Sequence, residues 1–146
     1  MKFKRKWLII GSISILLALL LIYLLMPKIN SRASIAIEIE DTTSFSTEEL
    51  DQGVETVINY FNHNWNGATL KSIHFDNAWY QNEMSNTKNT SYGHMPKENV
   101  LIFLTDFKTG RKSDGSLSPH SEISSWQIIL TRKTKHSPWQ VIDQGI

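Results

Sequence analysis

Two neighbouring segments near the end of the chain, 125–134 and 139–145, carry the residues best suited to bind a ligand. Along each segment these side chains are an even number of positions apart, a pattern typical of one face of a β-strand. Two indoles with one charge of each sign would suit a binding pocket with a polar contact in an apolar wall. The candidate ligand-binding residues in these segments are Trp126, Arg132, Trp139 and Asp143.

The turn between the two segments, Lys135-His136-Ser137-Pro138, predicts how they pair. If Lys133 pairs with Pro138, Arg132 lies beside Trp139 and Ile128 lies beside Asp143 on one surface. The alternative is that both tryptophans belong to the hydrophobic core and the two charges lie at its margin.

Asp106 is the fifth candidate ligand-binding residue. It lies near the end of an apolar run, 100–107, and shares a strand face with Ile102 and Leu104. A carboxylate partly buried on such a face could serve as a general acid or base. The alternative is that it caps a loop backbone.

The sequence lacks the motifs that mark other common catalytic and metal-binding sites. The chain has no cysteine, its five histidines fall in different segments, and no HExxH or GxSxG sequence occurs. Calcium loops need regularly spaced acids, which are also missing. We therefore predict no metal site and no cofactor, and we assign no catalytic residue.

The charge is distributed unevenly over the 146 residues. The chain has 15 Lys and Arg against 14 Asp and Glu, and four of the bases precede residue 7. The other 11 bases and all 14 acids follow, so this part carries a net charge of −3. A nucleic-acid-binding domain should carry a basic excess, so the charge argues against a nucleic-acid partner.

Residues 7–26 form an uncharged, Leu- and Ile-rich run. Twenty helical residues span about 30 Å, the thickness of the membrane hydrocarbon, so we predict a transmembrane helix. The preceding bases favour a cytoplasmic N-terminus, which places the protein in the cell membrane as a single-pass protein with its C-terminal domain outside. A cleaved signal peptide is the alternative.

The chain is therefore predicted to have four parts. They are a basic tail (1–6), the membrane helix (7–26), a linker with a possible short strand (27–44) and an extracytoplasmic domain (45–146).

The elements of this domain follow from periodicity and capping. Ser46 and Glu49 form a capping box, Phe45 and Leu50 form a hydrophobic staple, and an apolar stripe then predicts a helix that ends at Asn66-Gly67. We expect a loop with one helical turn around Trp79 over 77–98. The predicted strands are 35–39, 70–76, 100–107, 125–134 and 139–145. These elements predict an α+β fold, with one helix packed on a curved antiparallel sheet.

A series of short motifs stands in a fixed order along the chain. The motifs are Asn66-Gly67-Ala68-Thr69-Leu70, Glu98-Asn99-Val100, Leu104-Thr105-Asp106-Phe107, Asp114-Gly115-Ser116, Pro119, residues 126–132 and residues 139–145. This series resembles a family of small exported lipoproteins and membrane-anchored proteins of Gram-positive bacteria. The outline of the domain is similar to cystatin-like and nuclear-transport-factor-2-like domains. The resemblance implies export and an α+β domain, and it supplies no catalytic residues. The lipoprotein members of the family would have an acylated cysteine, which this chain lacks.

We therefore predict a non-enzymatic, membrane-anchored module that binds a ligand or a partner protein at the cell surface. The membrane itself would be a partner through residues 7–26. One alternative is a small hydrolase-like enzyme that uses Asp106 or Asp143. Another is an accessory subunit of a membrane or secretion complex.

Overall fold

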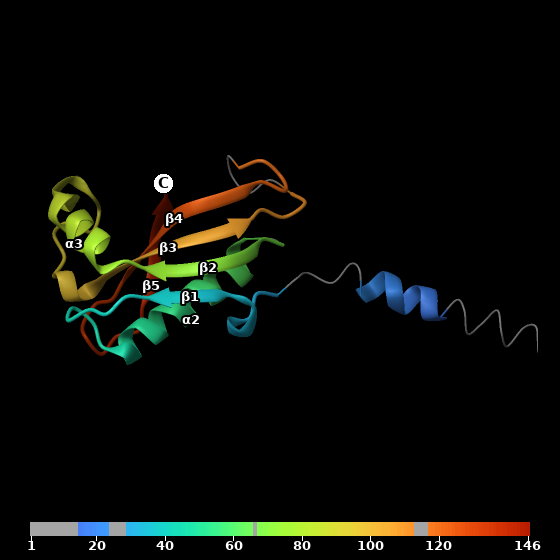
Figure 1. Cartoon of the computed structure of the whole chain (residues 1–146), viewed down its shortest axis with the longest axis horizontal. Helices are drawn as coiled ribbons and strands as arrows, with labels where there is room; N and C mark the ends of the chain where they lie inside the picture. The colour runs from blue at the N-terminus through green and yellow to red at the C-terminus, as the bar shows by residue number, and fades with distance from the viewer. Residues whose placement is uncertain (1–14, 24–28, 66, 113–116) are drawn as a thin grey trace, which may run out of the picture.

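The computed structural model describes residues 15–23, 29–65, 67–112 and 117–146. They form an α+β domain in which five strands make one mixed sheet, with α2 across one face (Figure 1). The strands are β1 (Ala36–Ile39), β2 (Thr69–Phe75), β3 (Val100–Lys108), β4 (Glu122–Thr131) and β5 (Gln140–Gly145). The helices that pack on them are α2 (Thr47–Asn64) and α3 (Asn77–Asn86).

The predicted transmembrane helix is wrong for the part of the chain that the structure describes. No helix there is long and apolar enough to cross a membrane. Residues 7–14 and 24–26 of the predicted span lie outside the described residues.

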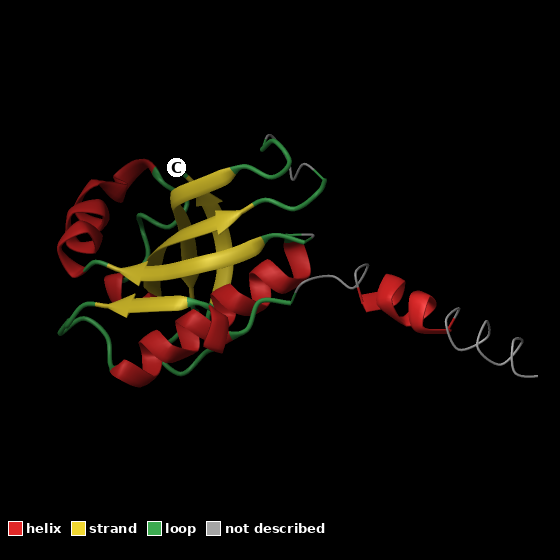
Figure 2. Cartoon of the chain, turned by 45° about the vertical axis from the view of Figure 1, so that its right-hand side comes forward, coloured by secondary structure: helices red, strands yellow, loops and turns green. Residues whose placement is uncertain are grey.

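The strands follow one another in the order β1-β2-β3-β4-β5. The last three pairings are antiparallel, as expected, but β1 and β2 are parallel. The prediction of a purely antiparallel sheet is therefore wrong for this pair. The reason is that α2 connects β1 to β2 as a crossover, which returns the chain to the sheet in the same direction. In the sequence α2 lies between β1 and β2, and Figure 2 shows this helix lying across one face of the sheet.

The predicted start of α2 is confirmed. The Ser46 hydroxyl accepts from the Glu49 N–H at 3.2 Å, and the Glu49 carboxylate accepts from the Ser46 N–H at 2.7 Å. Phe45 and Leu50 are both buried beside this capping box. The stripe that follows forms the helix side of the core, with Leu50, Val54, Val57, Ile58 and Phe61 all buried.

Residues 77–98, which were predicted to form a loop with one helical turn, contain more helical structure than expected. They include α3 and two short 3-10 turns, Thr87–Asn89 and Lys97–Asn99. Asp76 caps α3 by accepting from the Trp79 N–H at 2.8 Å. Only Tyr80 and Met84 of α3 are buried, so the helix carries too narrow an apolar stripe to be recognised from periodicity.

Hydrogen bonds of Asn30 hold the segment before β1 against the rest of the domain. The Asn30 side chain is buried, donates to the Ala68 carbonyl at 3.1 Å and accepts from the Leu70 N–H at 2.7 Å. Its backbone N–H and carbonyl both bond to the side chain of Asn62 in α2. The predicted linker is therefore folded from Asn30 onward, and its possible short strand is β1.

Candidate functional site

The predicted neighbours Arg132 and Trp139 lie together, as the turn between them indicated. The guanidinium carbon of Arg132 lies 4.3 Å from the centroid of the Trp139 ring. Both side chains are buried, and Trp139 also packs edge-on against Phe45 at a centroid distance of 6.1 Å. This contact is a cation–π interaction at the base of the turn between β4 and β5.

Trp126 lies near the other end of α2. It packs edge-on against Trp65 and Phe107, at centroid distances of 6.0 and 6.1 Å. Trp65 follows the last turn of α2, whereas the Trp139 indole donates to the Glu49 carbonyl in the first turn at 3.1 Å. These two contacts are sixteen positions apart along the chain, which corresponds to about 24 Å of helix. The two indoles therefore contact opposite ends of α2 and do not come together in one binding pocket.

Asp143 is displaced from its predicted partner by an irregularity in the sheet. Leu130 pairs with Val141, but Ile129 pairs with Asp143, so Ile142 is an extra residue in β5. The expected pair of Ile128 with Asp143 is therefore wrong, because Ile128 faces Gln144. Asp143 is exposed, and its carboxylate accepts from the Gln144 N–H at 2.8 Å.

Asp106 bridges three strands. One carboxylate oxygen accepts from the Ser72 hydroxyl in β2, and the other accepts from the Ser125 N–H in β4, each at 2.9 Å. Ser125 adopts a positive φ of 55°, where the register between β3 and β4 shifts. Asp106 therefore accepts from strand backbone at an irregular position of the sheet, and not from a loop backbone as the alternative predicted.

Replacing Asp106 with alanine should lower the free energy of unfolding by about 1–2 kcal/mol, because both donors lose their acceptor. Asp106→Asn should retain most of the stability, since an amide can accept from the Ser125 N–H and donate to the Ser72 hydroxyl. Urea unfolding of both variants measures these changes. The exposed Asp143→Ala serves as control and should stay within about 0.5 kcal/mol of the unmodified protein. Equal losses for Asp106→Ala and Asp143→Ala would contradict the bridging role.

A buried ion pair joins α2 to the hairpin. Arg132 Nη2 lies 2.6 Å from Glu49 Oε1, and the Arg132 side chain is only 2% exposed. The same guanidinium donates to the backbone carbonyls of Glu98 at 2.7 Å and Lys135 at 3.1 Å. We call the contacts among Glu49, Arg132 and Trp139 the latch. Sequence reasoning identified Glu49 only as a capping residue, because nothing local links it to a partner 83 positions away.

The Glu49 carboxyl is held in its ionised form. Burial by itself raises its pKa, but hydrogen bonds from the Ser46 N–H and the Arg132 guanidinium outweigh burial. Together with the Ser46 hydroxyl and the positive charge of Arg132, they lower the pKa to about 2. The latch is therefore charged at neutral pH.

The lowered pKa of Glu49 predicts a pH-dependent contribution to stability. Because the folded-state pKa lies below the ordinary value of 4.5, the contribution is fully present above about pH 5. It is lost as the pH falls toward about 2. In denaturant unfolding, Glu49→Gln should therefore be clearly less stable than the unmodified protein at pH 7. The difference should shrink as the pH falls from about 5 to 2, and a constant difference would contradict this assignment.

Beside the latch lies an open groove of about 1170 Å³, between the first turns of α2 and the turn that joins β4 to β5. We call it the α2–turn groove. Its helix wall carries the acids Glu48, Asp51 and Glu55, whereas Lys135 and His136 lie on its turn wall. Its lining residues are 46–49, 51, 52, 55, 56 and 135–139.

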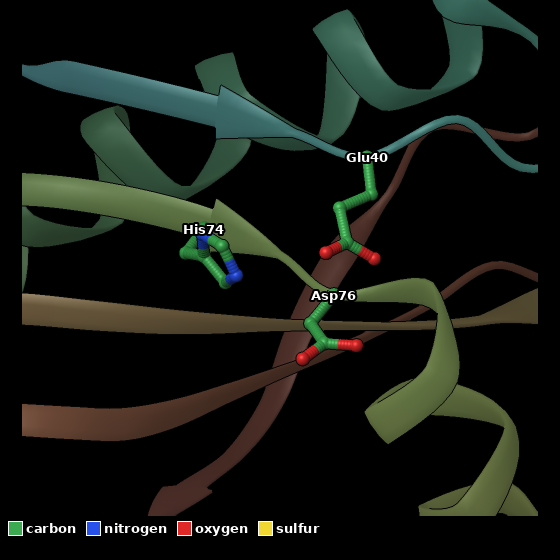
Figure 3. Close-up of side chains that lie close together, drawn as sticks. All are labelled: Glu40, His74 and Asp76. Carbon is green, nitrogen blue, oxygen red and sulfur yellow. The ribbon is translucent and has the colours of Figure 1, made fainter.

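A second group of polar side chains gathers where β1 and β2 end. Glu40, His74 and Asp76 each offer one ligand atom, and these atoms lie within 4.8 Å of one another (Figure 3). Glu40 is exposed and the other two are half-buried. The sequence did not indicate this group, because its members come from segments more than 30 residues apart and match no spacing motif.

Comparison with family models, with curated proteins and with solved structures finds no match to this chain. The resemblance to exported Gram-positive proteins therefore stays a prediction.

Proposed function

We propose that the domain is a binding module that holds a segment of a partner protein in the α2–turn groove. The observation that carries this proposal is an open groove whose two walls are joined by the latch. Arg132 binds Glu49 on the helix wall and the Lys135 carbonyl on the turn wall, so the walls are held at a set separation. A binding surface that is already ordered loses little conformational entropy when it takes up a ligand.

The size and polarity of the groove favour a polypeptide segment. Its volume of about 1170 Å³ exceeds the range of about 300–1000 Å³ that is usual for small-molecule pockets. Most of its lining side chains carry a polar group, as Glu48 and Gln52 do, and both of these are exposed. A peptide can satisfy such groups along its backbone and side chains.

The charges of the helix wall favour a basic side chain in that segment. This wall already binds one guanidinium of the chain itself, because Arg32 pairs with Asp51 and with Glu55, the latter at 3.0 Å. Glu48 lies one turn earlier and is exposed. A lysine or arginine of the partner would meet a complementary charge there, which contributes mainly to specificity and association rate.

Site-specific photo-crosslinking tests this proposal. With a photoreactive amino acid in place of Gln52 on the helix wall, we expect a discrete protein adduct in the native host. The same adduct should form when the photoreactive group replaces His136 on the turn wall. The charge reversal Glu48→Lys should reduce its yield several-fold.

The matched control places the photoreactive group at Ser85, an exposed position of α3 away from the groove. This control should give no such adduct. Absence of any adduct from both walls of the groove would overturn the proposal, as would an equal adduct from Ser85.

A further inference from the structure

We propose that Glu40, His74 and Asp76 form a binding site for a divalent transition-metal ion such as Zn²⁺. The site shares no residue with the α2–turn groove, so it is independent of the proposed partner binding.

The parallel pairing of β1 and β2 brings the three residues together. Glu40 directly follows β1, and its backbone N–H donates to the Phe75 carbonyl at 3.0 Å, which fixes it beside the end of β2. His74 lies near the end of β2 and Asp76 follows it. Figure 3 shows the three side chains close together at these strand ends.

The first turn of α3 holds both carboxylates in place. Glu40 Oε2 accepts from the Asn77 N–H at 3.1 Å, and Asp76 Oδ1 accepts from the Trp79 N–H at 2.8 Å. Each carboxylate thus has one oxygen bound to backbone and a second oxygen available to a cation. Carboxylates that ligate metals are commonly oriented by such hydrogen bonds.

Glu38 supplies a separate indication of metal binding. It pairs with His74 across β1 and β2, and its Oε2 lies 3.3 Å from His74 Nδ1. Metal-binding histidines commonly have a carboxylate beside their second ring nitrogen, which orients the imidazole. The ion-pair contact of Glu38 places a carboxylate beside Nδ1, so Nε2 is the nitrogen that we expect to bind the metal ion.

The ligand atoms of Glu40, His74 and Asp76 need to move only slightly closer together to bind a Zn²⁺ ion. Ligand atoms about 2.0–2.2 Å from a tetrahedral Zn²⁺ lie about 3.3 Å apart, against the present limit of 4.8 Å. Small shifts of all three side chains, with the hydrogen bonds from α3 to Glu40 and Asp76 kept, can close this difference. One imidazole with two carboxylates favours a first-row transition metal over Ca²⁺, which takes six to eight oxygen ligands. Three protein ligands leave room for water on the ion.

Calorimetric titration of the full chain with ZnCl₂ tests the site. We expect one Zn²⁺ per chain, bound more tightly than Ca²⁺. His74→Ala should weaken binding at least 100-fold, and Glu38→Gln should weaken it about 10–100-fold, as is typical when the outer support of a ligand is lost. His94→Ala is the control, because it removes an exposed histidine outside the group and should leave the affinity unchanged.

Asp76→Asn separates metal binding from folding. Asparagine caps a helix about as well as aspartate, so this variant should keep α3 while it weakens Zn²⁺ binding at least 10-fold. The proposal is overturned if no stoichiometric Zn²⁺ binding occurs at micromolar concentration. It is also overturned if His74→Ala and Asp76→Asn bind as tightly as the unmodified chain, or if Ca²⁺ binds more tightly than Zn²⁺.

Discussion

Replacing Arg132 with methionine is expected to lower the free energy of unfolding by about 3–5 kcal/mol, the usual cost of breaking a buried ion pair. The loss is large because methionine leaves the Glu49 carboxylate, only 14% exposed, without its partner. The carbonyls of Glu98 and Lys135 lose their donor in the same substitution. Methionine retains much of the apolar volume against Trp139, so the effect reports the lost charge and hydrogen bonds. Urea unfolding at pH 7 measures it.

Arg32→Met is the matched control for this prediction. Arg32 also pairs with acids of α2, Asp51 and Glu55, but all three side chains are about half exposed. Exposed ion pairs contribute about 0–1 kcal/mol, so this variant should remain close to the unmodified protein. If both arginine variants lose the same small amount, the latch does not stabilise the domain as we infer.

Replacing Gly53 with alanine is expected to destabilise the domain by about 1–3 kcal/mol, the usual cost of overpacking a core. Alanine has the higher helix propensity by about 1 kcal/mol, so an isolated helix would respond in the opposite direction. The difference arises because an added Cβ would lie 2.6 Å from Leu101 Cδ2 and 2.9 Å from Phe103 Cε2. Both of these β3 side chains are fully buried and cannot move aside without disturbing the core.

Gly145→Ala provides the control for overpacking. An added Cβ at Gly145 would meet no atom within 4 Å, so thermal unfolding should change little. An increase in stability for Gly53→Ala would show that α2 lies further from β3 than the structure places it.

The local features of this domain were predictable from the sequence. The capping box at Ser46, the buried stripe of α2 and the short strand before it all rest on residues a few positions apart. The contact of Arg132 with Trp139 was predictable for the same reason, because a short turn sets which residues face each other. The α+β class follows from these elements.

The sequence-based predictions were wrong where a structural feature depended on residues outside the segment that forms it. The parallel pairing of β1 with β2 depends on the path of α2 between them, and strand periodicity carries no information about direction. The extra residue Ile142 in β5 moved Asp143 away from Ile128, and a regular period of two cannot reveal such a bulge. The predicted membrane helix is a separate error, because it was inferred from the apolar run 7–26 alone. None of the helices in the described part of the chain has both the length and the hydrophobicity that a membrane span requires.

The sequence by itself thus determined the capped helix, the existence of most strands and the hairpin contact, because hydrogen bonds and side-chain periodicity act over a few residues. Only the tertiary structure decided which distant side chains meet. It joined Glu49 to Arg132 across 83 positions and gathered Glu40, His74 and Asp76 at the ends of two parallel strands. The physical reason is that such contacts depend on strand direction, register and the packing of α2, which are set by the burial of the whole core.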